Sequence, residues 1–170
     1  MKKIMFNDKY GLTQAVLVGK KTMTRRLVPN KTIIKPTFHV GEEVAIAQSY
    51  RTLNQYGYVA PSWLDHTCEN SAGYRNKMFV RGELMPHSIK ISSVNVQRLQ
   101  YISDEDCLRE GVERQVGCYI VTGIMENQGQ NNVCFDTPRR AFAELIDRIN
   151  GKGTWNSNPW VYVYEFKLLR

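Results

Sequence analysis

Alternation of hydrophobic and polar residues predicts more strands than helices along this chain. The clearest case is 87–102, "HSIKISSVNVQRLQYI", whose apolar residues share one face only if the register shifts once between Ile91 and Val94. A β-bulge produces such a shift. Further strands are predicted for 3–6, 22–28, 42–50, 56–63, 76–84 and 158–170.

Residues 102–112, "ISDEDCLREGV", carry the signals of a short helix at both ends. Ser103 can cap the N-terminus, and Asp106 stands three residues later in the capping-box position. Acidic residues fill the first turn, where the helix dipole favours them. Gly111 is suited to end the helix, so the sequence predicts a short helix between these residues.

Two further helices are predicted from hydrophobic spacing. Residues 8–21 place apolar side chains at helical spacing before Gly19, which is suited to end a helix. Residues 136–153 begin with Thr137 as a cap and Pro138 at the first helical position. One apolar stripe follows, at Phe142, Leu145, Ile146 and Ile149.

The predicted strands and helices do not alternate regularly. This argues against a doubly wound parallel sheet and favours an α+β protein, with a mixed or antiparallel sheet or small β-barrel and a few flanking helices. The sequence contains no internal repeat, low-complexity tract or Pro/Gly-rich linker, so one domain over residues 1–170 is predicted. Segments 51–76 and 113–132 carry little pattern and are predicted to be loops.

The composition is that of a folded protein with one hydrophobic core. Hydrophobic residues make up 42% and charged residues 23% of the 170 residues, which is near the average for globular domains. No apolar run approaches the ~20 residues that span a bilayer. The first residues, "MKKIMFNDKYGL", lack the apolar region of a signal peptide. We therefore predict a cytoplasmic protein with no membrane partner.

The four cysteines, Cys68, Cys107, Cys118 and Cys134, form no CxxC pair and no regular framework. Free thiols in a reducing compartment are the predicted state. His66 and Cys68 form an isolated HxC that lacks a second pair at recognisable spacing, so no metal site is predicted.

The net charge of +7 is concentrated at the N-terminus. Residues 1–35 hold nine Lys or Arg against Asp8 alone, a balance of +8, whereas the remaining residues balance at −1. This arrangement is expected of a surface that faces phosphates, although a basic surface that only keeps the protein soluble would look the same.

The densest part of this basic segment is "GKKTMTRRLV", residues 19–28. A threonine hydroxyl such as that of Thr24 becomes a nucleophile when a neighbour takes its proton, and a desolvated Lys21 beside other cations has its pKa lowered towards that task. Arg26 can hold a phosphate, a carboxylate or a developing oxyanion through paired hydrogen bonds. The same residue types are also ordinary on a strand surface, so both interpretations stand.

Glu110 is the second candidate for chemistry because of its place in the helix over 102–112. The last turn of a helix disfavours a carboxylate, and acids usually occupy the other end. Such a position is tolerated on open surface, but it is also one way to tune a general acid or base towards neutrality.

The segment "VLVGKKTMTRR" resembles the G-[KR]-K-T-x-T-x-R signature of the ASCH domain, a family of PUA-like β-barrels. The matching residues are Gly19, Lys20, Lys21, Thr22, Thr24 and Arg26. Three further blocks resemble the family in the same order, namely "FHVGEEVAIAQSY", "LQYISDEDCLREGV" and "NPWVYVYEFKLL". The resemblance covers most of the chain and is closest to the longer members found in bacteriophages and prophages.

The resemblance implies two functions. As a relative of RNA-binding PUA domains, the chain would bind RNA or a nucleotide, with Lys20, Thr22, Arg25 and Arg26 contacting phosphates. As a relative of the small ASCH amidohydrolases, it would deacylate N4-acylcytidine or a related modified nucleoside with Lys21, Thr24 and Glu110, using no metal or organic cofactor. Arg25 departs from those enzymes, which tend to carry an apolar residue at the matching position.

Overall fold

The structure is a computed structural model that describes residues 1–29, 35–55, 69–126, 129 and 131–169. Its main sheet has five strands in the order β1-β3-β4-β7-β2. Strands β1 and β3 are parallel, and the other neighbours are antiparallel. The strands are β1 (Lys3–Ile4), β2 (Met23–Leu27), β3 (Glu43–Ile46), β4 (Ser88–Arg98) and β7 (Trp160–Leu168).

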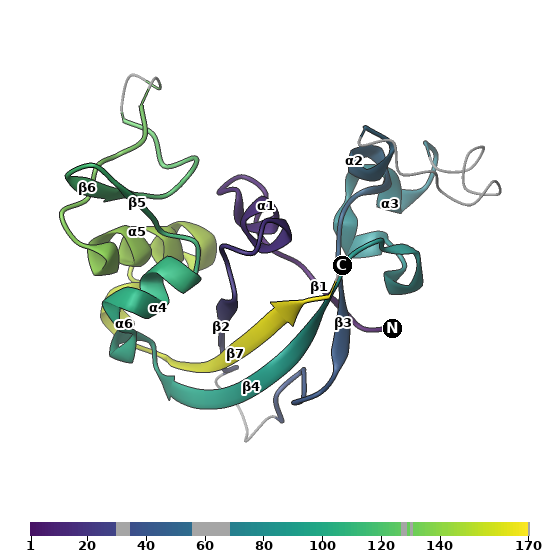
Figure 1. The fold of residues 1–170 in the computed structure, drawn as a ribbon, viewed down its shortest axis with the longest axis horizontal. Coiled ribbons are helices and arrows are strands. Elements are labelled where there is room, and N and C mark those ends of the chain that lie inside the picture. Colours follow the sequence, from purple (N-terminus) through teal and green to yellow (C-terminus); the bar gives the residue numbers. More distant parts are fainter. Residues whose placement is uncertain (30–34, 56–68, 127–128, 130, 170) are drawn as a thin grey trace.

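The predicted β-bulge in the long strand is confirmed. The register of β4 against β7 shifts between Ile91 and Ser93, so that the two strands stay paired over nearly their whole length. Both strands curve strongly, and the helices and the edge strands lie on the concave side of this curve (Figure 1). A bulge increases local bending and twist, which lets the sheet wrap around side chains carried by the helices.

The fold is a mixed α+β arrangement, and its sheet is curled rather than visibly closed. Strands β1 and β2 form the two edges, and no backbone pairing joins them within the described residues. The guanidinium of Arg26 on β2 donates to the Met5 carbonyl just after β1, at 2.5 Å. A side chain therefore connects the two edges where a closed barrel would have a strand pair, and the closed barrel remains a prediction.

The helices with clear capping signals form where the sequence predicts them. Helix α4 (Asp104–Arg109) begins after Ser103, whose hydroxyl accepts from the Asp106 amide at 3.1 Å. Helix α5 (Pro138–Asn150) begins after Thr137, whose hydroxyl accepts from the Arg140 amide at 3.2 Å. Helix α1 (Leu12–Leu17) is shorter than its spacing predicts, and a four-residue helix α6 (Thr154–Ser157) follows α5.

Two predicted strands are wrong or too long. Residues 76–84 form two short 3₁₀ turns, η1 (Lys77–Phe79) and η2 (Gly82–Leu84). The Asn76 side chain caps η1, and no strand of the described residues pairs with the segment. Residues 42–50 form β3 only as far as Ile46, and helix α2 (Tyr50–Gln55) starts at the end of the segment. The strand predicted over 56–63 lies outside the described residues.

The two segments predicted as loops contain regular structure. Besides α2, the first segment includes helix α3 (Ala72–Arg75). The second contains a hairpin of β5 (Glu113–Gln115) and β6 (Cys118–Ile120), turning at Gly117, whose φ is +79°. Such short strands have too few residues to show alternation, which is why the sequence pattern missed them.

The prediction of free thiols is wrong for two of the cysteines. Cys118 and Cys134 form a disulfide that ties β6 to the segment before α5. Cys107 is a free, buried thiol, and desolvation raises its pKa to about 12. Cys68 and His66 lie outside the described residues. The pairing was missed because a single 16-residue separation fits no recognisable framework.

The main hydrophobic core lies between the concave side of the sheet and helices α1, α4 and α5. A second, smaller cluster is formed by Ala47, Tyr50, Leu53 and Val80 under α2 and α3. Among the described residues, no helix has the length and apolar character needed to cross a membrane. The edge of the main core, where β2, α4 and α5 meet, is where the candidate site lies.

Candidate functional site

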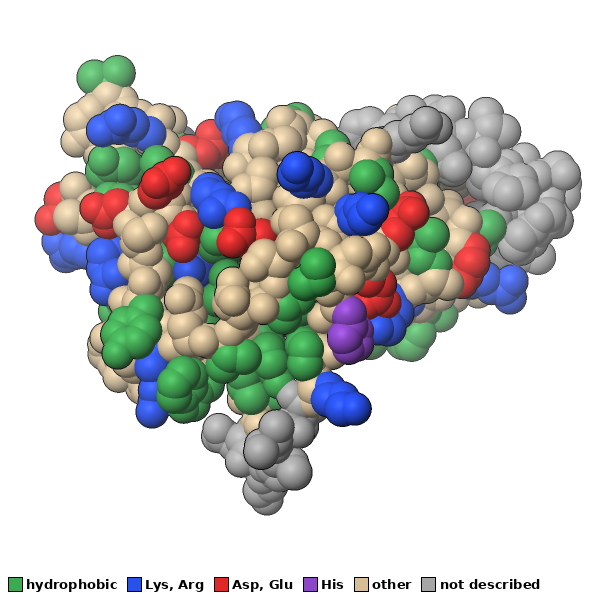
Figure 2. All heavy atoms as spheres, turned by 60° about the horizontal axis from the view of Figure 1, so that its bottom comes forward, with side chains coloured by type: hydrophobic (Ala, Val, Ile, Leu, Met, Phe, Trp, Pro, Cys, Tyr) green, Lys and Arg blue, Asp and Glu red, His purple; other side chains and the backbone are tan. Residues whose placement is uncertain are grey.

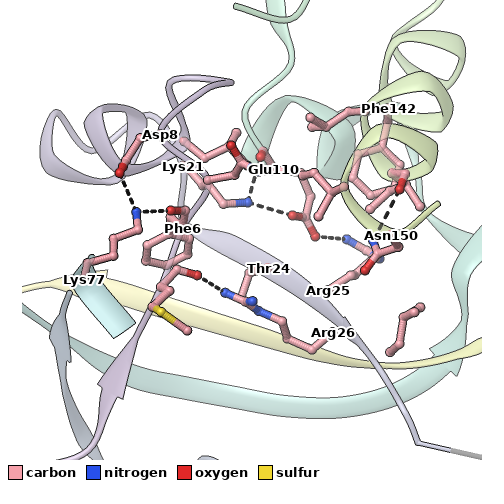
Figure 3. Close-up of a pocket in the computed structure, with 17 residues that line it drawn as sticks. Phe6, Asp8, Lys21, Thr24, Arg25, Arg26, Lys77, Glu110, Phe142 and Asn150 are labelled. Carbon is pink, nitrogen blue, oxygen red and sulfur yellow. Dashed lines mark hydrogen bonds and ion pairs between the residues drawn. The ribbon is translucent and has the colours of Figure 1, made fainter. Parts of the chain in front are cut away.

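A cavity of about 400 Å³ opens between β2, the segment after β1, the end of α4 and one side of α5. We call it the main cavity. Four of the predicted basic-segment residues line it, namely Lys21, Thr24, Arg25 and Arg26. Glu110, which is 85 or more residues away along the chain from each of Lys21, Thr24 and Arg25, lines it as well. The structure therefore brings the two sequence candidates together (Figure 3).

Lys21 lies at the turn between α1 and β2, where its backbone is held from two sides. Its amide donates to the Ala15 carbonyl at 2.9 Å, and the next amide, of Thr22, donates to the Arg109 carbonyl at 3.0 Å. The Lys21 side chain is 2% exposed and donates to Glu110 Oε2, to the Glu110 carbonyl and to the Met23 carbonyl, each at 2.7 Å. These three bonds match the three N–H groups of an ammonium.

Burial lowers the pKa of Lys21 below its usual value, and contact with Glu110 offsets part of that effect. The neighbouring cations Arg25 and Arg26 act in the same direction as burial. At a given pH, a larger fraction of such a lysine is neutral than of a surface lysine. Only the neutral form can accept a proton.

Glu110 is the C-terminal cap of α4, as its place in the sequence indicated. Gly111 follows with φ +113°, and an added Cβ there would lie 2.7 Å from Leu12, so glycine is required for this close turn. The carboxylate is buried and accepts from Lys21 through Oε2 and from Arg25 through Oε1, at 2.7 and 3.0 Å. Two cations thus compensate for the unfavourable end of the helix dipole.

Arg25 is almost fully enclosed, with a side chain 1% exposed. Its Nη1 donates to Glu110 at 3.0 Å and to the Met23 sulfur at 2.9 Å, while Nη2 donates to Asp106 at 3.0 Å. The predicted phosphate contact would have to compete with these two carboxylates. The sequence predicted Asp106 only as a helix-capping residue, and it gave no indication that Asp106 pairs with Arg25.

Thr24 lies on β2 opposite Tyr164 of β7 and is 5% exposed. Its side chain lines the main cavity together with Lys21 and Glu110 (Figure 3). Within the part of the chain that the structure describes, its hydroxyl has no hydrogen-bond partner. A hydroxyl at the cavity wall that is not committed to the protein is available to a ligand.

Lys20 and Thr22 do not line the main cavity. Lys20 is exposed and forms an ion pair with Glu113 at 3.3 Å. The Thr22 hydroxyl accepts from Arg109 Nε at 3.2 Å. Of the predicted phosphate-binding set, only Arg25 and Arg26 line the main cavity, so that set is divided between the cavity and the surface outside it.

The opposite wall of the main cavity was not predicted from sequence. It consists of Phe142, Leu145, Ile146, Ile149 and Asn150 on α5. The apolar stripe was visible in the sequence and was interpreted as core alone, whereas Ile149, at 38% exposed, lies at its outer end. Lys77 and Asp8 form an ion pair of 2.8 Å at another side of the cavity.

Four of the nine basic residues of 1–35 are paired with carboxylates from later in the chain. Carboxylates from later in the chain contact Lys2 (Glu42, 2.8 Å), Lys20, Lys21 and Arg25. On the face drawn in Figure 2, acidic and basic side chains are interspersed. Charge counted along the sequence therefore overstates the positive surface that reaches solvent.

The fold and the site define an α+β protein with a curled mixed sheet and a cavity walled by a buried lysine–glutamate pair. Among solved structures it is similar to protein EF3133 from Enterococcus faecalis V583, assigned to family DUF984, with 12% identity over 99% of this chain and 80% of that one, and a TM-score of 0.49. No protein-family model matches the sequence, and no curated protein is significantly similar to it. The described residues contain no cluster of His, Cys, Asp or Glu that could hold a metal ion.

Proposed function

We propose that this protein is a PUA-like barrel protein of the ASCH type that hydrolyses an amide bond in a nucleoside-sized substrate, N4-acylcytidine or a related modified nucleoside. The observation that carries the proposal is the buried 2.7 Å contact between Lys21 and Glu110 at the wall of a cavity that Thr24 also lines. A cavity of about 400 Å³ is within the usual range for a small-molecule site.

In the proposed reaction, the Lys21 ammonium first passes a proton to Glu110 across their 2.7 Å contact. The Thr24 hydroxyl then adds to the amide carbonyl while the neutral Lys21 takes the hydroxyl proton. The lowered pKa of Lys21, caused mainly by burial, favours this neutral form. These steps need no group beyond the three side chains and the substrate.

The C–N bond breaks when Glu110 delivers the proton to the leaving amine. An ester on Thr24 remains, and water hydrolyses it to a carboxylic acid while the hydroxyl is restored. One water is consumed, and one amine and one carboxylic acid are released. Arg25, whose enclosed guanidinium donates to Glu110 at 3.0 Å and to Asp106, acts on the reaction by orienting the Glu110 carboxylate, so it is a positioning residue.

The walls of the main cavity fit such a substrate. The polar wall carries the three reacting side chains, and the apolar wall is the α5 stripe that ends at Ile149 and Asn150. A nucleoside bearing an acyl group has both a polar base and an apolar substituent, and each can face a wall of matching character.

A second candidate function is binding of RNA or a nucleotide without chemistry. Arg26 favours it, because this guanidinium contacts no carboxylate in the described residues and faces the main cavity. The ion pairs of Lys20 and Arg25 support it less, since both cations are already engaged. Binding and hydrolysis share one cavity, so turnover is the property that separates them.

The test is turnover of N4-acetylcytidine by purified protein, followed by chromatography of the cytidine released. The variants Lys21→Met, Thr24→Val and Glu110→Gln are each expected to lower the rate by at least about 100-fold, the usual cost of removing a nucleophile or a general acid or base. Lys90→Met, an exposed lysine on β4, is the matched control and is expected to keep the full rate. Wild-type protein that binds the compound but releases no cytidine would exclude the hydrolase and leave binding.

A further inference from the structure

A second cavity adjoins the main one on the other side of Arg26. Its volume is about 280 Å³, and we call it the tyrosine cavity because Tyr162 and Tyr164 of β7 form its floor together with Phe38. Met5, Arg26 and Leu27 line both cavities. The two cavities are therefore adjacent, and Arg26 is the charged residue that they share.

The charged groups of the tyrosine cavity are all of one sign. Among the described residues that line it, the ionised side chains are Lys3, Arg26 and Lys35, with no carboxylate. Lys3 donates to the Met78 and Val80 carbonyls at 2.5 and 2.6 Å, so it contributes charge rather than free donors. Lys35 is exposed, and no described residue pairs with it.

Arg26 has unused hydrogen-bonding capacity at this position. A guanidinium has five N–H groups, and the described contacts of Arg26 occupy only one, in the bond from Nη2 to the Met5 carbonyl. Its Nε is buried and has no hydrogen-bond partner among the described residues. An unpaired buried donor costs about 1–3 kcal/mol, and an acceptor on a ligand would remove that cost.

The aromatic side chains that line the tyrosine cavity pack against one another. The rings of Tyr162 and Tyr164 lie 6.1 Å apart, and Phe38 packs edge-on against Tyr164 at 5.4 Å. The Tyr164 hydroxyl accepts from the Thr37 amide at 3.2 Å, which fixes that ring. A cationic rim over a fixed apolar floor suits a ligand with an anionic group joined to an apolar ring or sugar face.

We propose that the tyrosine cavity is a phosphate-binding subsite, held by Arg26 and Lys35, for a phosphate monoester on the molecule whose base enters the main cavity. The inference rests on the proposed function and names its substrate as a nucleotide rather than a free nucleoside. Arg26 contacts both parts of such a ligand, and its guanidinium geometry matches two phosphate oxygens. The negative phosphate finds no repelling carboxylate among the described residues that line this cavity.

The test compares binding of cytidine 5′-monophosphate and cytidine by calorimetry, which needs no turnover. We expect the phosphate to tighten binding at least about tenfold at low salt, with the preference shrinking as salt screens the exposed Lys35. Arg26→Met is expected to abolish the preference and Lys35→Met to reduce it about threefold. Lys90→Met, an exposed lysine outside both cavities, is expected to keep it.

Equal affinities for nucleotide and nucleoside in the wild-type protein would overturn the subsite, even if N4-acetylcytidine is turned over. If Lys90→Met reduces the phosphate preference as much as Lys35→Met does, the subsite is overturned as well, because the preference would then depend on the overall charge of the protein. A phosphate preference without any turnover would support the subsite and reject the hydrolase. A 5′-phosphorylated dinucleotide that binds as tightly as the mononucleotide supports the subsite with an RNA end as its source, and a weaker dinucleotide supports it with a free nucleotide.

Discussion

The main cavity and the tyrosine cavity share Arg26 and differ in how their charges are arranged. In the main cavity, Lys21, Arg25 and Lys77 each contact a carboxylate. In the tyrosine cavity, the described lining residues include three cations and no acid. The first arrangement favours proton transfer between fixed partners, and the second leaves positive charge available to an incoming anion.

Two adjacent residues of β2 account for this difference. Arg25 pairs in register with Val163 and Arg26 with Tyr162, so strand alternation directs them to opposite faces of the sheet. Arg25 meets the acidic end of α4, and Arg26 meets the gap between the edge strands. Two cations that are adjacent in the sequence can therefore have different partners, because they point to opposite faces of the same strand.

The largest effect is expected from Lys21→Met, which removes the proton acceptor of the main cavity and leaves the tyrosine cavity unchanged. Turnover of N4-acetylcytidine should fall at least about 100-fold, since the proton acceptor is lost. Chemical denaturation should show a loss of about 3 kcal/mol, because two carbonyls and one side of a buried carboxylate lose their donor. The phosphate preference measured by calorimetry should persist, and its loss would mean that the two cavities are not independent.

The next effect separates the two arginines of β2. Arg25→Met should lower the free energy of unfolding by about 3 kcal/mol, because it leaves Glu110 and Asp106 short of a buried partner. Arg26→Met should cost about 1 kcal/mol at most, since it removes one hydrogen bond to a carbonyl but also an unpaired buried donor. Urea titrations of both variants under identical conditions measure the difference, and equal losses would contradict the contrast in pairing.

A smaller effect is expected from the Cys118–Cys134 disulfide, which ties the hairpin to the start of α5. Replacing both cysteines by serine should destabilise the protein by about 2 kcal/mol, because the unfolded chain loses a closed loop of this length. Helix α5 walls the main cavity and not the tyrosine cavity. In the variant without the disulfide, the Michaelis constant for N4-acetylcytidine should therefore rise by a larger factor than the affinity for the phosphate group falls. A larger loss of phosphate affinity would mean that the hairpin does not act on the main cavity through α5.

The smallest effect is a pH dependence that belongs to Lys21. The pKa of Lys21 is lower in the folded protein than its usual 10.5. At pH values between the folded-state pKa and 10.5, the unfolded chain therefore binds more protons than the folded protein does. Stability from this group therefore increases as pH rises through that window and is flat below the folded value. The rate of turnover should rise over the same window, where neutral Lys21 accumulates. A Lys21→Met variant should show neither trend when both are measured between neutral pH and 10.5.

Local signals in the sequence were enough for some elements and not for others. Ser103 and Thr137 act on amides three residues ahead, so the starts of α4 and α5 could be predicted from a few neighbouring residues. The hairpin of β5 and β6 is too short for a pattern, and its disulfide depends on a contact across 16 residues. Short-range reasoning reaches the first kind of feature only.

The candidate site divides in the same way. The resemblance to ASCH domains brought Lys21, Thr24 and Glu110 together, and the structure places all three around one cavity. No local pattern could show that Arg25 meets Asp106, which is 81 residues away, or that α5 supplies the opposite wall. These depend on how the sheet curls, which the alternation of single strands does not determine.

The three oxygens around Lys21 Nζ have a consequence for how this protein evolves. Two of them are backbone carbonyls, at Met23 in β2 and at Glu110 after α4, and backbone atoms remain whatever side chains change around them. A descendant that no longer needed the reaction would still lose stability without a donor at residue 21. Selection for stability therefore favours this lysine even without catalysis. In a lineage of relatives, the change that marks lost catalysis is expected at Thr24, whose hydroxyl has no hydrogen-bond partner among the described residues.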